Sequence, residues 1–280
     1  MSPPGAAGSR IPVALAIAGS DSGGGAGIQA DLKAFARAGV HGTTAITAIT
    51  AQNTTGVRSV HSIAPESIRD QVAAVAEDIR VDAVKVGMLG GAETIAAVVS
   101  ALRESGLAGR VPLVVDPVMV AESGAVLLDP GAKRALVEEL LPLATVVTPN
   151  LPEARELADT EHDDREALAR AILELGPEAV VVTGGHTEDG ADLLVERGGD
   201  PVAITGPRHP DGASHGSGCT HSSVLAAQLA LGLELPDAAR RAREITAAAV
   251  AAGHRELGAG AGPVNALGVA PPDVGHNPSS

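Results

Sequence analysis

The stretch of this chain with the clearest chemical potential is a glycine loop that leads into an apolar, alanine-rich segment. It reads Asp211-Gly-Ala-Ser-His-Gly-Ser-Gly-Cys-Thr-His-Ser-Ser223 and contains Cys219, the only cysteine. The apolar run at 224–233 indicates a helix, whose start would present backbone N–H groups at the positive end of the helix dipole and favour a phosphate or an oxyanion. We expect the dipole to lower the pKa of Cys219 so that the thiol acts as base or nucleophile. A glycine-rich turn with a small buried cysteine is the alternative.

Two other chemistries compete for the same loop. Gly212-Ala-Ser-His-Gly216 matches a serine-nucleophile pattern, which needs a strand directly before it and a helix directly after it. A polar segment precedes the motif here and the predicted helix begins only near Thr220, so the context disfavours a serine hydrolase. His215, Cys219 and His221 could bind zinc, but one thiol among glycines suits backbone donation better than metal ligation.

Composition and charge limit the class of protein. The chain has 280 residues, of which 45% are hydrophobic and 19% charged, as is typical of a globular domain. A net charge of −14 and a single aromatic residue, Phe35, argue against a nucleic-acid surface. One cysteine rules out an intramolecular disulfide and is compatible with a reducing cytosol. We see neither a signal peptide nor an apolar run of membrane-spanning length, and therefore expect a cytoplasmic protein without membrane contact.

Short apolar runs alternate with segments of helical periodicity along the chain. Strands are predicted at 12–18, 42–50, 57–63, 83–86, 111–115, 145–148 and 179–183, with a hairpin formed by 192–196 and 202–205. Helices are predicted at 28–38, 65–78, 94–105, 133–141, 165–175, 220–231 and 236–252. This alternation predicts an α/β fold with a mostly parallel sheet covered by helices on both faces. We expect one domain at 11–268 and flexible tails at 1–10 and 269–280.

Polar residues gather directly after the predicted strands. The clusters are Gly19–Asp21, Gln52-Asn53, Gly87-Met88, Asp116, Asn150 with Glu153, and Gly184–His186. Ligands of open α/β sheets bind outside the carboxyl ends of the strands, so these residues are predicted to converge on one crevice that the loop 212–219 closes. A Gly-x-Gly-x-x-Gly register and a Gly-Lys-Ser/Thr loop are both absent, which disfavours a nicotinamide-dependent oxidoreductase and a P-loop NTPase.

The motif Asn150-x-x-Glu153 has two interpretations. Its amide and carboxylate could hold hydrated Mg²⁺ bound to phosphates. The same spacing is that of a capping box, with Asn150 before the first helical residue and Glu153 at the third. The spacing by itself favours the cap.

Several motifs, in order along the chain, resemble the hydroxymethylpyrimidine/phosphomethylpyrimidine kinases, the thiamine-pathway branch of the ribokinase-like kinases. They are the segments 18–33 and 47–57, Lys85-Val-Gly-Met-Leu89, Asp116-Pro-Val-Met119, Thr148-Pro-Asn-Leu-Pro-Glu153, Gly184-Gly-His186 and His215-Gly-Ser-Gly-Cys-Thr220. The resemblance, which extends from about Val13 to Val264, implies a three-layer α/β/α fold and phosphorylation by ATP and Mg²⁺. It implies 4-amino-5-hydroxymethyl-2-methylpyrimidine as substrate, and then its monophosphate, which becomes the diphosphate. Related pyridoxal kinases share the scaffold, so a pyridoxal or pyridoxine kinase is an alternative, and a non-catalytic pyrimidine-binding sensor is another.

The resemblance also implies roles for individual residues. Those of the pyrimidine pocket are Gln52, Asp31, Gly19, Met88 and Val118. Those of the catalytic anion hole are Gly216, Ser217 and Gly218, followed by Cys219 at the place of the aspartate base of related sugar kinases. Those on the side of ATP are Asn150, Glu153, Asp116, Thr183 and Gly185, with Asn150 and Glu153 holding Mg²⁺ through water.

The chain departs from the family pattern at three places. Ser217 replaces a common threonine and keeps its hydroxyl, whereas Thr183 replaces a common lysine and loses a contact to ATP or phosphate. Arg243 replaces a lysine late in the chain. The partners implied are the pyrimidine and ATP, and we expect a homodimer.

Overall fold

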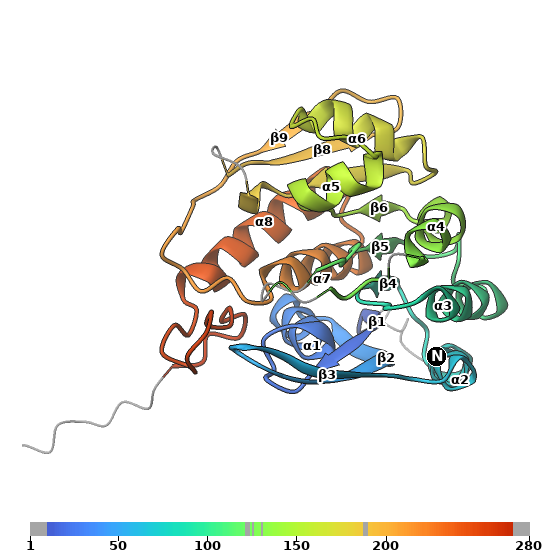
Figure 1. Ribbon diagram of the computed structural model, residues 1–280. Coiled ribbons are helices and arrows are strands. Elements are labelled where there is room, and N and C mark those ends of the chain that lie inside the picture. The colour runs from blue at the N-terminus through green and yellow to red at the C-terminus, as the bar shows by residue number, and fades with distance from the viewer. Residues whose placement is uncertain (1–9, 121–123, 125, 130, 187–189, 271–280) are drawn as a thin grey trace, which may run out of the picture.

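The computed structural model describes residues 10–270, apart from 121–123, 125, 130 and 187–189. Within this part, nine strands form one sheet in the spatial order β3-β2-β1-β4-β5-β6-β7-β8-β9 (Figure 1). They are β1 (Val13–Asp21), β2 (His41–Asn53), β3 (Gly56–Ser62), β4 (Ala83–Val86), β5 (Leu113–Val115), β6 (Val146–Val147), β7 (Ala179–Val182), β8 (Asp192–Glu196) and β9 (Val202–Ile204). The predicted tails fall almost wholly outside the described residues.

The middle of the sheet is parallel and both of its edges are antiparallel. Strands β2, β1, β4, β5, β6 and β7 run in one direction. Strand β3 pairs antiparallel with β2, β8 with β7 and β9 with β8. All residues of β4, β5 and β7 are buried, which explains why these strands are apolar runs, with Lys85 in β4 as the exception. The predicted mostly parallel sheet and the predicted hairpin at its end are confirmed.

Helices cover both faces of the sheet and complete a three-layer α/β/α fold (Figure 1). One face carries α1 (Gly27–Ala38), α7 (Ser217–Ala230) and α8 (Leu235–Ala251). The other carries α2 (Pro65–Asp78), α3 (Ala92–Glu104), α4 (Ala132–Ala135), α5 (Leu151–Ala158) and α6 (Arg165–Leu173). Each face has its own apolar core, so the sheet is covered on both sides as predicted.

Three helical segments differ from their prediction. Helix α7 begins at Ser217 and not near Thr220, because Gly216 takes a left-handed φ of 81° and starts the helix earlier. Residues 151–158 form a separate helix, α5, of which the sequence analysis anticipated only the cap. The segment predicted as a helix at 133–141 is α4 followed by a π-helical turn, η1 (Leu136–Leu140), and a 3-10 turn, η2 (Leu141–Leu143), that contains Pro142.

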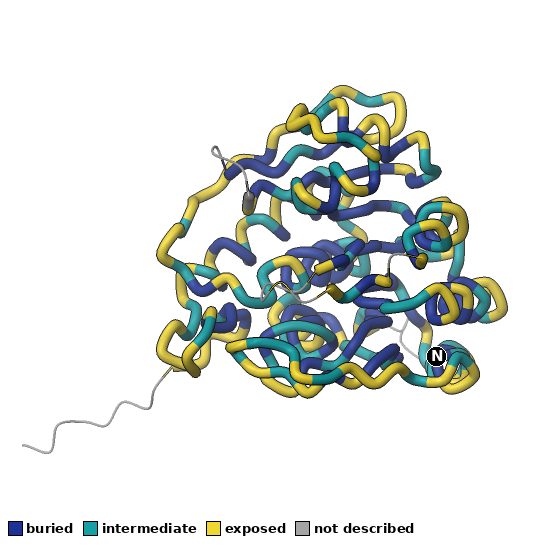
Figure 2. Tube along the Cα trace, viewed as in Figure 1, coloured by how far each residue is buried: buried dark blue, intermediate teal, exposed yellow. Residues whose placement is uncertain are grey.

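Helix α7 is the central helix of its layer. Residues 220–228 are all buried, and Figure 2 shows the buried residues concentrated on the sheet and on this helix. Ala226 and Ala227 belong to the same core cluster as Ala14 and Ala16 of β1, and small side chains let a helix lie close to a sheet. The start of α7 is thereby held at the carboxyl end of the sheet. No helix in the described ranges is both long and apolar enough to cross a membrane.

Candidate active site

Two glycine loops pack against each other where β1 ends and α7 begins. A Cβ atom added to Gly216 would lie 1.8 Å from the carbonyl oxygen of Gly25. A Cβ atom added to Gly25 would lie 2.2 Å from Cδ2 of His215. Side chains at these two positions would therefore separate the loops, which is the physical reason for glycine at both.

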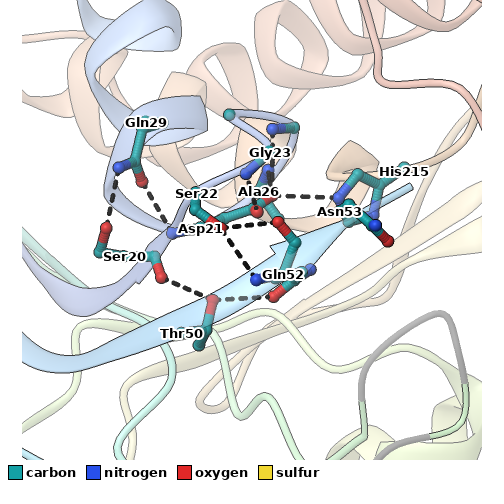
Figure 3. A network of polar contacts seen from close by, with 12 residues as sticks. Ser20, Asp21, Ser22, Gly23, Ala26, Gln29, Thr50, Gln52, Asn53 and His215 are labelled. Atoms are coloured by element: carbon teal, nitrogen blue, oxygen red, sulfur yellow. Dashed lines mark hydrogen bonds and ion pairs between the residues drawn. The ribbon is translucent and has the colours of Figure 1, made fainter. Parts of the chain in front are cut away.

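Asp21, at the end of β1, organises the first of these loops (Figure 3). Its Oδ1 accepts a hydrogen bond from the N–H of Gly23 at 2.8 Å, and its Oδ2 accepts from Gly25 at 3.0 Å and from Ala26 at 2.8 Å. Nε2 of His215 lies 3.1 Å from the same Oδ2. Burial by itself would raise the pKa of Asp21, but the hydrogen bonds from His215, Ala26 and Gly23 lower it. Asp21 and His215 therefore join the two loops, a link that the sequence analysis missed.

The first turn of α7 offers backbone donors to a ligand. The N–H of Ser217 donates to the carbonyl oxygen of Ser214 at 2.9 Å, whereas those of Gly218 and Cys219 have no partner in the part of the chain that the structure describes. A Cβ atom on Gly218 would meet nothing within 4 Å, so open space lies beside this backbone. Unpaired N–H groups at a helix start bind anions. The geometry thus supports an anion hole at the predicted place.

The thiol of Cys219 differs from the expectation in its ionisation. Burial raises its pKa to about 12; Lys85 acts in the opposite direction, but Asp116 and Asp31 add to the increase. The N–H of Gly27, at the start of α1, donates to the sulfur. The predicted lowering of this pKa by the helix dipole is therefore wrong for the protein without ligands, in which the thiol is neutral at pH 7.

A buried charge cluster lies beside Cys219. Nζ of Lys85 is 2.9 Å from Oδ1 of Asp31 and 3.9 Å from Oδ2 of Asp116. Burial raises the pKa of both carboxyls, and the positive charge of Lys85 opposes this effect. The side chain of Asp31 has no exposed surface in this structure, and its place in the pyrimidine pocket stays a prediction. The sequence did carry a signal for the missed Lys85, because a lysine inside an apolar strand needs a buried partner.

Three successive side chains of α7 each bind a buried carboxylate from a different element. His221 lies 3.0 Å from Asp192 of β8, Ser222 donates to Asp116 after β5 at 2.9 Å, and Ser223 donates to Asp31 of α1 at 2.7 Å. Successive residues of a helix point about 100° apart, so a helix buried on all sides can hold partners in three directions. The start of α7 is therefore fixed by polar contacts as well as by apolar packing.

Asn150 and Glu153 form the predicted capping box at the start of α5. The N–H of Glu153 donates to Oδ1 of Asn150, and the N–H of Asn150 donates to Oε2 of Glu153, both at 2.9 Å. Burial and the nearby Asp116 raise the pKa of Glu153 to about 8, against hydrogen bonds from the backbones of Asn150 and Met119. Two buried carboxyls whose pKa values are both raised by burial suit a divalent cation, because the cation can replace a bound proton.

The donor set fits Mg²⁺ better than zinc. The described residues contain no group of three or more histidine, cysteine, aspartate or glutamate side chains arranged to hold a metal. Mg²⁺ needs only one or two carboxylates when phosphates and water complete its coordination. Asp116 and Glu153 could supply these carboxylates, whereas the amide oxygen of Asn150 is already bound to the backbone of α5. His215 and His221, considered above as zinc ligands, each contact an aspartate instead.

The residues expected to form the pyrimidine pocket come from neighbouring strand ends. A Cβ atom on Gly19 would lie 3.1 Å from Sδ of Met88, so these two are in contact across β1 and β4. Gln52, at the end of β2, is held through Ser22, whose hydroxyl donates to the Gln52 carbonyl at 2.6 Å and accepts from the Gln52 N–H at 2.8 Å (Figure 3). Gln52 and Val118 are both half-buried.

A cavity of about 350 Å³ adjoins Gln52 and His215 and is lined further by 53–56 and 259–261. A larger hollow of about 580 Å³ lies between α1, α7 and α8, lined by Arg37, Leu231 and Arg241 among others. The larger hollow contains none of the predicted site residues. Size alone therefore does not locate the site, and the convergence of polar side chains does.

Thr183 and Gly185, predicted on the side of ATP, follow β7. The N–H of Thr183 donates to the carbonyl oxygen of Pro149 at 2.9 Å, and Thr183 forms a parallel bridge with Asn150. Gly185 is exposed, and a Cβ atom there would meet nothing within 4 Å. Thr183 thus lies beside the capping box at the carboxyl end of the sheet. Arg243 of α8 lies near Asp192, since it is among the groups that lower the pKa of Asp192.

The open start of α7 suits a phosphate, and Asp116 and Glu153 suit a divalent cation. In a three-layer α/β/α fold, these features are what a phosphoryl-transfer enzyme of the kinase class needs. The chain belongs to the phosphomethylpyrimidine kinase family, whose profile matches residues 21–265. The resemblance found in the sequence motifs is therefore confirmed.

Individual relatives cover nearly the whole chain. A hydroxymethylpyrimidine/phosphomethylpyrimidine kinase of Rhizobium meliloti is 49% identical over 261 residues, which are 90% of this chain and 96% of the relative. The crystal structure of phosphomethylpyrimidine kinase from Clostridium difficile is similar with a TM-score of 0.73 at 42% identity, covering 84% of this chain and 96% of that one. An ADP complex of Bacillus subtilis pyridoxal kinase is similar with a TM-score of 0.81 at 38% identity, covering 91% and 97%. The ribokinase-like fold expected from the resemblance is thus confirmed.

Proposed function

We propose that this protein transfers the γ-phosphoryl group of ATP to 4-amino-5-hydroxymethyl-2-methylpyrimidine and then to the resulting monophosphate, as a step of thiamine biosynthesis. The observation that carries the proposal is the open backbone of Gly218 and Cys219 at the start of α7, within a chain whose relatives are named for both phosphorylations. We place this activity in a single domain, 11–268, of a cytoplasmic homodimer.

The backbone donors of the anion hole hold the γ-phosphoryl oxygens while charge shifts toward the bridging oxygen. Phosphoryl transfer depends mainly on positioning and charge stabilisation, so N–H groups aimed at the transferred group suffice for much of the rate. Asp116 and Glu153 would hold Mg²⁺, with water and phosphate oxygens completing its coordination. The ion would neutralise charge on the phosphates. Gly185 and Thr183 line the nucleotide side.

Cys219 orients the substrate hydroxyl and does not remove its proton in advance. A thiol with a pKa of about 12 is protonated at neutral pH and has no free capacity as a base. It can still donate a hydrogen bond to the hydroxyl oxygen and hold it in line with the phosphorus. As the new O–P bond forms, the bond between the γ-phosphorus and the bridging oxygen breaks and ADP leaves. The hydroxyl proton, whose acidity rises as the bond forms, passes to an oxygen of the transferred phosphoryl group.

Gln52 selects the pyrimidine through its side-chain amide. An amide both donates and accepts, which matches the ring nitrogen and the exocyclic amine of an aminopyrimidine. Oγ1 of Thr50 lies 2.8 Å from the carbonyl oxygen of Ser20 and 3.2 Å from Oε1 of Gln52, so these two acceptors share its single proton (Figure 3).

Pyridoxal is the second candidate substrate. The similarity to the Bacillus subtilis pyridoxal kinase, with a TM-score of 0.81, favours keeping it. The deciding experiment measures ADP release with the pyrimidine alcohol, the pyrimidine monophosphate and pyridoxal in parallel. We expect the two pyrimidines to be turned over with higher kcat/KM than pyridoxal. Faster turnover of pyridoxal would reassign the substrate, and nucleotide binding without turnover of any of the three would indicate a sensor.

The homodimer is tested separately by sedimentation. Edge strand β3 leaves one row of backbone groups unpaired by the sheet, and such an edge is a common place for another chain to associate. We expect a mass near twice the 27.7 kDa of one chain. A single species of one chain mass at micromolar concentration would contradict it.

A further inference from the structure

A buried pair of His221 and Asp192 joins α7 to the turn that follows β7. The two side chains have only 6% and 1% of their surface exposed, and Nε2 of His221 lies 3.0 Å from Oδ2 of Asp192. The other oxygen of Asp192 accepts the N–H of Gly184 at 2.7 Å. Gly184 begins the turn η3 (Gly184–His186). One carboxylate thus binds both the central helix and this turn.

The turn is pressed against the residues that precede Asp192. A Cβ atom on Gly184 would lie 2.4 Å from the carbonyl oxygen of Ala191, so the turn has no room for a side chain at this point. Close backbone contact and the bond to Asp192 both fix the position of Gly184. A shift of the turn would therefore break its bond to Asp192, and a shift of Asp192 would break its bond to His221.

Burying this pair removes water from both side chains, and this desolvation opposes folding. Burial by itself would raise the pKa of Asp192, but His221, the Gly184 N–H and Arg243 together lower it, so the carboxylate stays charged. Nδ1 of His221 is buried and has no hydrogen-bond partner among the residues that the structure describes. Buried ion pairs often stabilise a fold no better than apolar side chains of similar size. The single bond that His221 makes is therefore more readily explained by positioning than by stability.

The pair lies between the two elements to which we assign the phosphates of ATP. His221 follows Gly218 by three positions, so both lie on one face of α7. Gly184 lies between Thr183 and Gly185 on the nucleotide side. We propose that His221 and Asp192 are positioning residues that hold the Gly184 turn at a fixed distance from the anion hole, so that both bind one nucleotide polyphosphate. This inference rests on the proposed binding of ATP at the site.

The test measures nucleotide and pyrimidine affinity by calorimetry, with ADP and Mg²⁺ and with the pyrimidine alcohol, and melting temperature alongside. His221→Leu removes the bond to Asp192, whereas His221→Gln keeps a donor of similar reach. Thr220→Val is the matched control, because the Thr220 hydroxyl is buried on the same helix and no described residue bonds to it. Asp192→Asn is a second disrupting variant of unchanged size.

We expect His221→Leu and Asp192→Asn to weaken ADP binding by about 10-fold to 100-fold, the range for a lost buried charge-assisted bond. Pyrimidine affinity should stay within twofold of wild type, KM for ATP should rise more than kcat falls, and His221→Gln should restore most of the affinity. Thr220→Val should bind ADP as the wild type does. ADP affinity within twofold of wild type in either folded disrupting variant would overturn the proposal, as would equal losses for ADP and pyrimidine.

These outcomes are separable from failure of the proposed function. If the wild-type protein binds ADP but phosphorylates neither pyrimidine, the substrate assignment is wrong while the ADP affinities still test the pair. If it phosphorylates the pyrimidines and His221→Leu leaves KM for ATP unchanged, the pair is structural and the function stands.

Discussion

Replacing Gly218 by alanine separates the role of this residue in binding from any role in folding. Gly218 is the second residue of α7, its φ is not left-handed, and a Cβ atom there would meet nothing within 4 Å. Alanine is favoured over glycine in a helix by about 0.5–1 kcal/mol. We therefore expect Gly218→Ala to fold normally, with a melting temperature that is unchanged or higher by about 1–3 °C.

The activity of this variant should nevertheless fall sharply. The added methyl group would occupy the open space beside the unpaired N–H groups of Gly218 and Cys219, where the γ-phosphoryl oxygens are proposed to bind. Loss of one such donor costs about 10²–10³ in kcat. We expect a loss of that size in coupled assays of ADP release, and a calorimetric pyrimidine affinity within twofold of wild type.

Gly216→Ala is the contrasting variant. Its Cβ atom would lie 1.8 Å from the carbonyl oxygen of Gly25, and its φ of 81° is unfavourable for alanine. This variant should lose stability as well as activity. A folded Gly218→Ala that keeps more than half of the wild-type kcat would refute the placement of the phosphoryl group at this backbone.

Three further predictions concern individual side chains. Cys219→Ser should keep kcat within about tenfold of wild type, because a hydroxyl can also orient the acceptor, whereas a loss of about 10²–10⁴ would show that the sulfur acts as a base after all. Gln52→Ala should weaken pyrimidine binding by about 1–3 kcal/mol through the ring groups left unpaired, and an unchanged calorimetric affinity would remove Gln52 from the pocket. Glu153 has a pKa raised from 4.5 to about 8, so the folded protein holds a proton that the unfolded chain releases, and stability should decrease as pH rises from 4.5 to 8. The free energy of unfolding, measured with urea at several pH values, should decrease less with pH for Glu153→Gln, because this variant has no carboxyl to titrate. An equal decrease with pH in the variant and the wild type would contradict the raised pKa of Glu153.

Sequence alone predicted the architecture, which the structure confirms, for a local physical reason. Strands that are buried on both faces must be apolar along their whole length, and the helices between them must show a periodic apolar face. The alternation of strands and helices can therefore be predicted from the sequence. Gly216 is needed by its own left-handed backbone conformation, and the box formed by Asn150 and Glu153 lies within one helical turn. These features depend on residues that are close in sequence.

Tertiary structure decided the charge state of the site. Lys85 and Asp31 are 54 positions apart, and Asp21 and His215 are 194 apart, so no local pattern indicates that they meet. The prediction for Cys219 failed for the same reason. It weighed the dipole of the helix that carries the thiol, whereas burial dominates the pKa, and Lys85 and two carboxylates from other elements act on it in opposite directions. Desolvation and Coulomb interactions depend on distance through space, and only the packed fold sets those distances.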